Sequence, residues 1–299
     1  MGRLTAIVLG AAAGGGFPQW NCRCPVCRLA WAGDARVKPR TQASIAVSAD
    51  AEHWILLNAS PDLRVQIQAT PALRPRGGLR GSPISAVILT GAEVDQTAGL
   101  LTLREHQSFA LFATGETLAT LAANPIFGVL AAGVVTRQRI RPDRPFVLPG
   151  GLHAELFAVP GKVALYFEGK KLRTEPGINV GVELVCGARR FVYVPAAAGV
   201  TKTVLERLAR ADIVMFDATL FVDDEMIITG TGTKTGRRMG HMPLDGEGGI
   251  ISALGNLKGR RILTHINNTN PILIDGSAER HKVEAAGFEV AEDGMEIVL

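Results

Sequence analysis

The sequence has 299 residues, of which 47% are hydrophobic and only 5% aromatic, so we expect a core built largely from Ala, Val, Leu and Ile. Its 32 basic and 28 acidic residues give a formal net charge of +4 and are spread along the chain. No block of Lys and Arg interleaved with aromatic residues occurs, which argues against a nucleic-acid partner. The mild basic excess is compatible with an acidic small-molecule ligand.

The N-terminal stretch Met1–Ala13 is apolar, yet it is too short to span a membrane. It lacks the form of a signal peptide, because Gly14–Gly16 and then a cysteine-rich run follow at once. We therefore interpret it as the first core strand. No other apolar run approaches the length of a membrane span, so the sequence predicts a cytoplasmic protein without membrane insertion.

Apolar runs alternate with Gly and Pro along much of the chain and predict the secondary structure. The expected strands are Thr5–Leu9, Ser44–Ser48, Trp54–Asn58, Ala86–Thr90, His153–Val159, Gly181–Val185, Phe191–Val194, Ile213–Phe216, Arg261–Thr264 and Phe288–Val290. The expected helices are Pro61–Ala69, Thr97–Glu105, Glu116–Asn124, Thr201–Ala209, Leu244–Leu257 and Ser277–Ala286, with Pro243 and Ser277 as helix starts. Because clusters of strands precede the helices, we predict packed sheets with helices outside, in one domain of residues 1–299.

Three cysteines, Cys22, Cys24 and Cys27, lie within six residues in a C-x-C-x-x-C run. Thiols this close in a reducing compartment favour a metal over disulfides, and tetrahedral Zn²⁺ takes such donors. We predict a structural zinc in a loop of about residues 17–28; the alternative is three buried or free cysteines. The fourth ligand is left open among Cys186, which has the pattern of a core residue, His265 and Asn268.

Two carboxylates stand at predicted strand ends. Asp95 lies in a polar loop between an apolar strand and a helix, where it would either cap the helix or bind a metal. Asp217 directly follows the apolar run Ile213–Phe216 and is either a site residue or an ordinary turn residue.

Two histidines also have settings that suggest a site. His265 follows an apolar strand and precedes the polar run Asn267–Pro271, which favours a site loop over a structural histidine. His241 comes after a Gly-rich approach from Thr229 to Gly240. Proton transfer, metal binding and substrate contact are all open roles for it.

Together these segments resemble the metallo-β-lactamase superfamily, in which a strand, loop and helix read T-H-x-H-x-D-H. Here Gly91, Glu93 and Gln96 stand in place of histidines, and Lys162 replaces the histidine of a later P-G-H motif. Asp95, Asp217 and His265 match the remaining ligands. The resemblance implies an αββα sandwich of two mixed β-sheets flanked by helices.

The loss of histidines has a physical consequence. A two-zinc hydrolase needs most of these imidazoles to hold a bridging hydroxide. The ligands that remain are rich in oxygen: Asp95, Asp217 and His265, with Gln96 as a further candidate. We expect one active-site metal, with Fe²⁺ favoured and Mn²⁺ or Zn²⁺ as alternatives.

Within the superfamily, the whole chain resembles the coenzyme PQQ biosynthesis protein B family. The segments that carry this resemblance run from the first strand to near the C-terminus: G-G-G-F-P-Q-W-N-C at Gly14–Cys22, S-P-D-L-R at Ser60–Arg64, M-G-H-M-P at Met239–Pro243 and H-I-N-N-T-N-P at His265–Pro271. At Gln96 the family usually has His.

The resemblance implies a role in the biosynthesis of pyrroloquinoline quinone (PQQ) from a Glu-Tyr-derived precursor. We expect an iron-dependent oxygenase that hydroxylates the tyrosine ring with O₂; the alternatives are a non-catalytic carrier of PQQ or its precursor and, less favoured, a phosphodiesterase-like hydrolase. Asp95 and Asp217 would be catalytic together with His241, which would contact substrate or move a proton. Arg64 and Lys162 are candidates to pair with substrate carboxylates. Other proteins of the pathway and a second copy of the chain are candidate partners.

Overall fold

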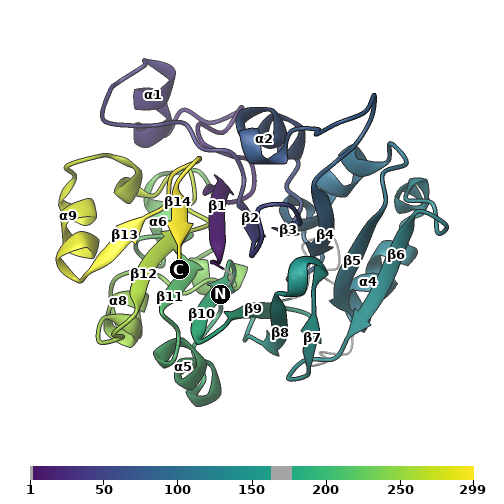
Figure 1. The fold of residues 1–299 in the computed structure, drawn as a ribbon. Coiled ribbons are helices and arrows are strands. Elements are labelled where there is room, and N and C mark those ends of the chain that lie inside the picture. The colour runs from purple at the N-terminus through teal and green to yellow at the C-terminus, as the bar shows by residue number, and fades with distance from the viewer. Residues whose placement is uncertain (1–2, 163–176) are drawn as a thin grey trace.

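Two seven-stranded β-sheets face each other in the computed structural model, which describes residues 3–162 and 177–299 (Figure 1). The first sheet has the order β14-β1-β2-β3-β4-β5-β6. Its strands are β1 (Thr5–Gly10), β2 (Ser44–Ser48), β3 (Trp54–Leu57), β4 (Ile84–Ile88), β5 (Phe109–Thr114), β6 (Val135–Ile140) and β14 (Glu296–Val298). Pairing is antiparallel from β14 to β3 and parallel from β3 to β6.

The second sheet repeats this pattern in the second half of the chain. Its order is β13-β12-β11-β10-β9-β8-β7. The strands are β7 (Pro145–Val147), β8 (His153–Ala158), β9 (Val180–Cys186), β10 (Arg189–Val194), β11 (Ile213–Asp217), β12 (Arg260–Thr264) and β13 (Phe288–Val290). Pairing is antiparallel from β7 to β10 and parallel from β10 to β13, so each sheet is mixed.

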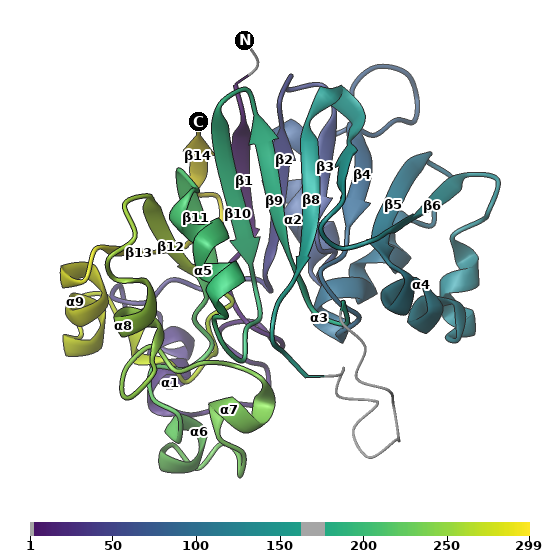
Figure 2. The same ribbon diagram turned by 90° about the horizontal axis from the view of Figure 1, so that it is seen from below.

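Helices cover the outer faces of the sheets and one end of the sandwich (Figure 2). They are α1 (Pro25–Trp31), α2 (Leu63–Ala69), α3 (Val94–Thr97), α4 (Gly115–Ala122), α5 (Lys202–Ala209), α6 (Glu225–Ile228), α7 (Gly236–Met239), α8 (Ile250–Leu254) and α9 (Ala278–Ala285). In the described part of the chain, none of the helices is long and apolar enough to cross a membrane.

Side-chain alternation along the strands separates three layers of core. In β1, Ala6 and Val8 face the core between the sheets, whereas Ile7 and Leu9 pack beneath the helices of the first sheet. A third core joins the outer face of the second sheet to α5, α8 and α9 through residues such as Val204, Leu254 and Val283. The predicted αββα sandwich of two mixed sheets is confirmed.

Every predicted strand is present, but β5, β6, β7 and β14 were not predicted. The predicted helix Leu244–Leu257 is wrong over its first half, because α8 begins only after the N-cap Gly249. Instead of starting a helix at Pro243, the chain there runs beside the segment after β11: the amide nitrogen of Leu244 donates to the carbonyl of Leu220 at 2.9 Å. Within the predicted helix Thr97–Glu105, only Thr97 is α-helical, as the last residue of α3, and a 3₁₀ helix follows at Ala98–Leu103.

Candidate active site

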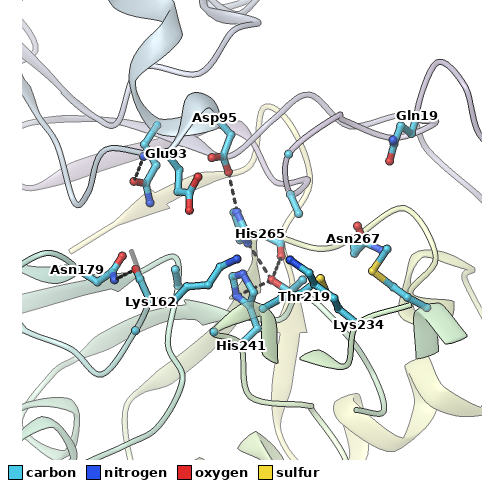
Figure 3. Close-up of a pocket in the computed structure, with 18 residues that line it drawn as sticks. Gln19, Glu93, Asp95, Lys162, Asn179, Thr219, Lys234, His241, His265 and Asn267 are labelled. Carbon is cyan, nitrogen blue, oxygen red and sulfur yellow. Dashed lines mark hydrogen bonds and ion pairs between the residues drawn. The ribbon is translucent and has the colours of Figure 1, made fainter. Parts of the chain in front are cut away.

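Loops at one end of the sandwich enclose a cavity of about 330 Å³. Asp95 lies in α3 after β4, Asp217 ends β11, and His265 follows β12. Parallel strands present their carboxyl ends at a common edge, which is where open α/β sheets bind ligands. The fold therefore brings together side chains that are far apart in the sequence (Figure 3).

Asp217, His241 and His265 form a cluster of potential metal donors whose ligand atoms lie within 4.8 Å of one another. His241 Nδ1 lies 2.6 Å from Asp217 Oδ2, and the two imidazole rings stack with centroids 5.4 Å apart. Asp217 is fully buried and also accepts hydrogen bonds from the backbone of Ala197 and Thr219, each at 3.1 Å. His241, for which the sequence left several roles open, thus lies within the donor cluster.

Thr219 connects all three members of this cluster. Its Oγ1 lies 2.6 Å from Asp217 Oδ1, 2.9 Å from His265 Nδ1 and 3.0 Å from His241 Nδ1. The hydroxyl can donate its one hydrogen to the carboxylate while accepting from the ring nitrogens. Because Nδ1 of His265 is engaged in this way, Nε2 is the nitrogen left to face a ligand. Sequence reasoning missed Thr219, which carries no charge and belongs to no metal motif.

Asp95 faces the cluster from the first sheet. Its Oδ2 lies 2.9 Å from His265 Nε2. The alternative role as helix cap is wrong: the N-cap of α3 is Glu93, which forms a reciprocal capping box with Gln96. Gln96 Oε1 accepts from the Glu93 amide nitrogen at 3.2 Å, so the helix start occupies the oxygen that was predicted to bind metal.

The charges in the cluster stabilise one another. Burial opposes a negative charge on Asp217, but the neighbouring His241 and His265 outweigh it and hold the pKa of the carboxyl well below its usual range. Burial likewise opposes a positive charge on His265, yet hydrogen bonds to Asp217 and Asp95 raise its pKa to about 10. The pKa of Asp95 is lowered, because its hydrogen bond to His265 outweighs burial. The site is therefore built to hold positive charge between two carboxylates.

His265 itself has an unusual backbone. Its φ is +56°, a left-handed conformation that non-glycine residues seldom adopt. The surrounding hydrogen bonds hold it there: the amide nitrogen of Ile266 donates to the carbonyl of Ala11, and that of Ala13 donates to the carbonyl of Ile266, both at 2.9 Å. Backbone strain of this kind concentrates at functional sites.

The two predicted substrate-binding cations lie in different places. Lys162 lines the cavity. Arg64 does not: it lies on α2, where its side chain is exposed and outside the cavity lining. The prediction for Arg64 was based on charge alone, and charge carries no information about the face of the sandwich on which a residue lies.

The three thiols predicted to bind zinc form a second cluster on the loop that leads into α1. Their Sγ atoms lie within 4.8 Å of one another. The backbone amide of Cys24 donates to Cys22 Sγ, and that of Cys27 donates to Cys24 Sγ, both at 3.4 Å. Burial raises the pKa of Cys24 to about 12, which a bound cation would reverse because the ligand is the thiolate.

Asn268 closes this thiol cluster. Its side-chain nitrogen lies 3.1 Å from Cys22 Sγ and 3.3 Å from Cys27 Sγ. Rotating the amide by half a turn would present its oxygen to the thiols instead. Of the three candidates for fourth ligand, Asn268 is therefore the one in place. Cys186 packs against the inner core, and His265 is engaged by the carboxylates.

The polar run after β12 contributes residues to the cavity and to the thiol cluster, and hydrogen bonds hold its side chains in place. Asn267 lines the cavity and donates to Thr269 at 2.6 Å, and Thr269 donates in turn to Glu225 at 2.5 Å. Asn270 donates to the carbonyl of Ala218 at 2.9 Å. Glu225, another residue that sequence reasoning missed, is buried, which raises its pKa to about 7.

Comparison with known proteins agrees with this architecture. The model of the beta-lactamase superfamily domain matches residues 53–266. A diphosphatase from the PhnP family shares the fold, with a TM-score of 0.68 at 21% identity over 99% of this chain and 97% of that one. Fold and donor positions together define a protein of the metallo-β-lactamase superfamily.

Similar proteins identify the family within this superfamily. Coenzyme PQQ synthesis protein B of Methylobacterium nodulans is 54% identical over 299 residues, covering 99% of this chain and 100% of the relative. The protein of the same name from Rhizobium meliloti is also 54% identical, over 99% of this chain and 98% of its own. The crystal structure of Zn²⁺-bound PqqB from Methylobacterium extorquens superimposes with a TM-score of 0.95 at 53% identity, covering 98% of this chain and 99% of that one. The chain belongs to the coenzyme PQQ synthesis protein B family, which ties it to the biosynthesis of PQQ.

Proposed function

We propose that the chain is a metal-dependent oxygenase that hydroxylates the tyrosine ring of a Glu-Tyr-derived precursor of PQQ. The observation that carries the proposal is the cluster of two imidazoles and one carboxylate, Asp217, His241 and His265, placed beside Asp95 at an open cavity. Asp95, Asp217 and His265 would give one ion few protein ligands, which leaves positions open for O₂ and substrate as non-haem iron chemistry requires, and His241 lies beside them for proton transfer.

The donor chemistry fits a single divalent ion. Asp95 and Asp217 would supply the negative charge, and the hydrogen bond that His265 Nδ1 donates to Thr219 orients the ring so that Nε2 points toward Asp95. This oxygen-rich set favours Fe²⁺, with Mn²⁺ and Zn²⁺ as alternatives. We leave Gln96 out of the proposed ligands because its oxygen belongs to the capping box of α3.

Each side chain has a separate task in this proposal. A bound ferrous ion supplies the chemistry of O₂ activation. Asp95, Asp217 and His265 would hold the ion, and Thr219 fixes the ring orientation of His265. His241, at the cavity wall, accepts or returns a proton at the ring carbon that is hydroxylated. Incorporation of one oxygen atom from O₂ also consumes two electrons, which an external reductant such as ascorbate provides.

The thiol cluster has a different proposed task. We propose that Cys22, Cys24, Cys27 and Asn268 hold a structural Zn²⁺; the binding of Zn²⁺ by the 53% identical relative supports zinc in this family. Closely spaced free thiols of this kind fit a cytoplasmic location.

The test is reconstitution with Fe²⁺ without oxygen, followed by O₂, ascorbate and the dipeptide Glu-Tyr, with products read by mass spectrometry. We expect a product heavier by one or two oxygen atoms, and its absence with Zn²⁺ in the cavity or with Asp217→Ala. If the iron-loaded protein binds the dipeptide but yields no oxygenated product, the oxygenase is wrong and the carrier function replaces it. Hydrolysis of a generic phosphodiester with Mn²⁺ would instead support the hydrolase.

A further inference from the structure

Two lysines point into the cavity from opposite sides of the two imidazoles (Figure 3). Lys162 follows β8, and Lys234 precedes α7. We propose that Lys162 and Lys234 form a two-point clamp that binds two separate carboxylates of one substrate molecule. This inference rests on the proposed function, because it names the groups by which the same cavity would recognise an acidic aromatic precursor.

Lys162 is held in its direction by its surroundings. Its backbone carbonyl accepts a hydrogen bond from Asn179 Nδ2 at 2.5 Å. Its aliphatic stem packs on Gly240, where a β-carbon would lie 2.9 Å from Lys162 Cγ. Gly240 has a φ of +86°, so glycine is required both by the backbone and by this close approach. A lysine whose stem is fixed loses less rotamer entropy on binding a ligand than a fully mobile one.

Lys234 lies on a segment that is anchored just beyond it. Thr235 is the N-cap of α7 and accepts from the amide nitrogen of Arg238. The carboxylate of Asp223 accepts from the amide nitrogen of Arg237 at 2.8 Å, and its backbone carbonyl accepts from that of Gly236, also at 2.8 Å. The start of α7 is therefore fixed, and Lys234 is half-buried at the cavity wall.

The charge balance of the cavity favours an acidic ligand. Asp95 and Asp217 would together neutralise one divalent ion, and the lining among the described residues then holds two ammonium groups, those of Lys162 and Lys234, and one further carboxylate, that of Glu93. The described lining with its ion would therefore carry a net positive charge. Ammonium–carboxylate pairs at a partly buried site are charge-assisted hydrogen bonds and stronger than neutral ones.

The cavity lining also offers contacts for an aromatic ring. Met226 and Met239 line the cavity together with Lys234, and methionine sulfur makes favourable contacts with ring edges. A ligand held by two carboxylates could extend a phenol ring from its backbone into the cavity that contains the donor cluster. Glu-Tyr has a side-chain and a C-terminal carboxylate on either side of its peptide bond and a phenol ring that branches from the tyrosine β-carbon.

The experiment measures binding and not turnover. Calorimetry is performed on the full-length protein loaded with Zn²⁺, with four dipeptides: Glu-Tyr, Gln-Tyr, and the C-terminal amide of each. We expect Lys162→Gln and Lys234→Gln each to weaken Glu-Tyr about tenfold or more. The affinity of each variant should not change when one carboxylate is removed from the dipeptide and should still fall when the other is removed. The carboxylate whose removal has no effect should be a different one for each variant.

Controls separate the clamp from general damage. Lys162→Arg and Lys234→Arg should restore most of the affinity, and Lys258→Gln, which removes the same charge at an exposed site, should leave it unchanged. If both glutamine variants weaken all four dipeptides equally, or neither weakens any, the clamp is wrong. Binding of inorganic phosphate in preference to Glu-Tyr by the unaltered protein would also overturn it. Failure of oxygenation with this binding pattern intact would reject only the proposed reaction.

Discussion

The thiol cluster and the cavity both take residues from the polar run after β12, but their donor residues come together in different ways. The thiols of Cys22, Cys24 and Cys27 come from six consecutive residues, and only Asn268 is contributed from afar. The cavity cluster draws Asp95 from one sheet and Asp217 and His265 from the other. A local cluster is specified by spacing, whereas an assembled one depends on the register of every strand beneath it.

The two clusters also differ in the type of their donor atoms. Soft sulfur atoms at a closed, mostly buried loop suit a structural ion, whereas carboxylates and imidazoles at an open cavity suit an ion that must admit O₂ and substrate. The comparison predicts that a mutation in either cluster should remove chiefly the ion of that cluster, with a smaller effect on the other ion, and that the two clusters should differ in their effect on stability.

The largest effect is expected from Cys24→Ser. Removing a thiolate from a structural site forfeits binding free energy that is also folding free energy. We expect the protein to lose one equivalent of zinc by elemental analysis and its thermal midpoint to fall by about 5 °C, which corresponds to roughly 3 kcal/mol for a chain of this size. Retention of the zinc with an unchanged midpoint would remove the structural role.

Asp95→Ala should weaken the binding of the cavity ion and leave the zinc at the thiols in place. The variant keeps the thiol cluster intact but removes one of the two carboxylates that face the cavity, so Fe²⁺ affinity should fall by at least about a hundredfold while one equivalent of zinc is retained. Titration with Fe²⁺ under anaerobic conditions measures the affinity. The thermal midpoint of the metal-free protein should change by less than that of Cys24→Ser; a larger fall would contradict the contrast between the two clusters.

Thr219→Val tests the positioning of the imidazoles. The variant has nearly the same shape but cannot hydrogen-bond to Asp217, His241 or His265. Loss of such an orienting partner typically weakens metal binding by about ten- to a hundredfold. Thr219→Ser, which keeps the hydroxyl, should restore most of the Fe²⁺ affinity. Equal affinities of the Val and Ser variants would show that the hydroxyl has no orienting role.

Glu225→Gln should have the smallest effect on the bound ions, and its effect on stability should appear as a pH dependence. Burial raises the pKa of Glu225 to about 7, so the native state binds the proton more tightly than the unfolded chain. The unfolding free energy of the unaltered protein should therefore fall relative to the variant as pH rises from about 4.5 to 7, by an amount on the order of 3 kcal/mol, and stay level above. Parallel denaturant titrations across this range measure the difference; a constant difference would reject the raised pKa.

Much of this molecule could be predicted because its signals are local or follow strong periodicity. The C-x-C-x-x-C spacing indicated a metal loop without any knowledge of the fold, and apolar runs marked the strands that build both sheets. The weaker strands β6 and β7 were missed because their residues are mostly exposed or half-buried and show no apolar run.

The rest of the site could not be predicted because it arises from long-range placement. Thr219 and Lys234 matter through atoms that approach from distant segments, and neither residue type stands out in a sequence. Arg64 shows the reverse case, since a residue chosen for its charge is exposed on α2 and lies outside the cavity lining. Motifs identify which residues carry chemistry, but only the fold decides which of them meet.

The short span between His265 and Asn268 has a thermodynamic consequence. His265 is a donor of the cavity cluster, and Asn268, three residues further on, contacts the thiols. An ion that orders either residue therefore also reduces the conformational entropy that the other residue loses when its own ion binds. Linkage requires the benefit to be mutual: zinc at the thiols would raise the affinity of the cavity for its ion by the same factor by which the cavity ion would raise that of the thiols for zinc. Removal of zinc from the thiols should therefore also lower the affinity of the cavity for its ion.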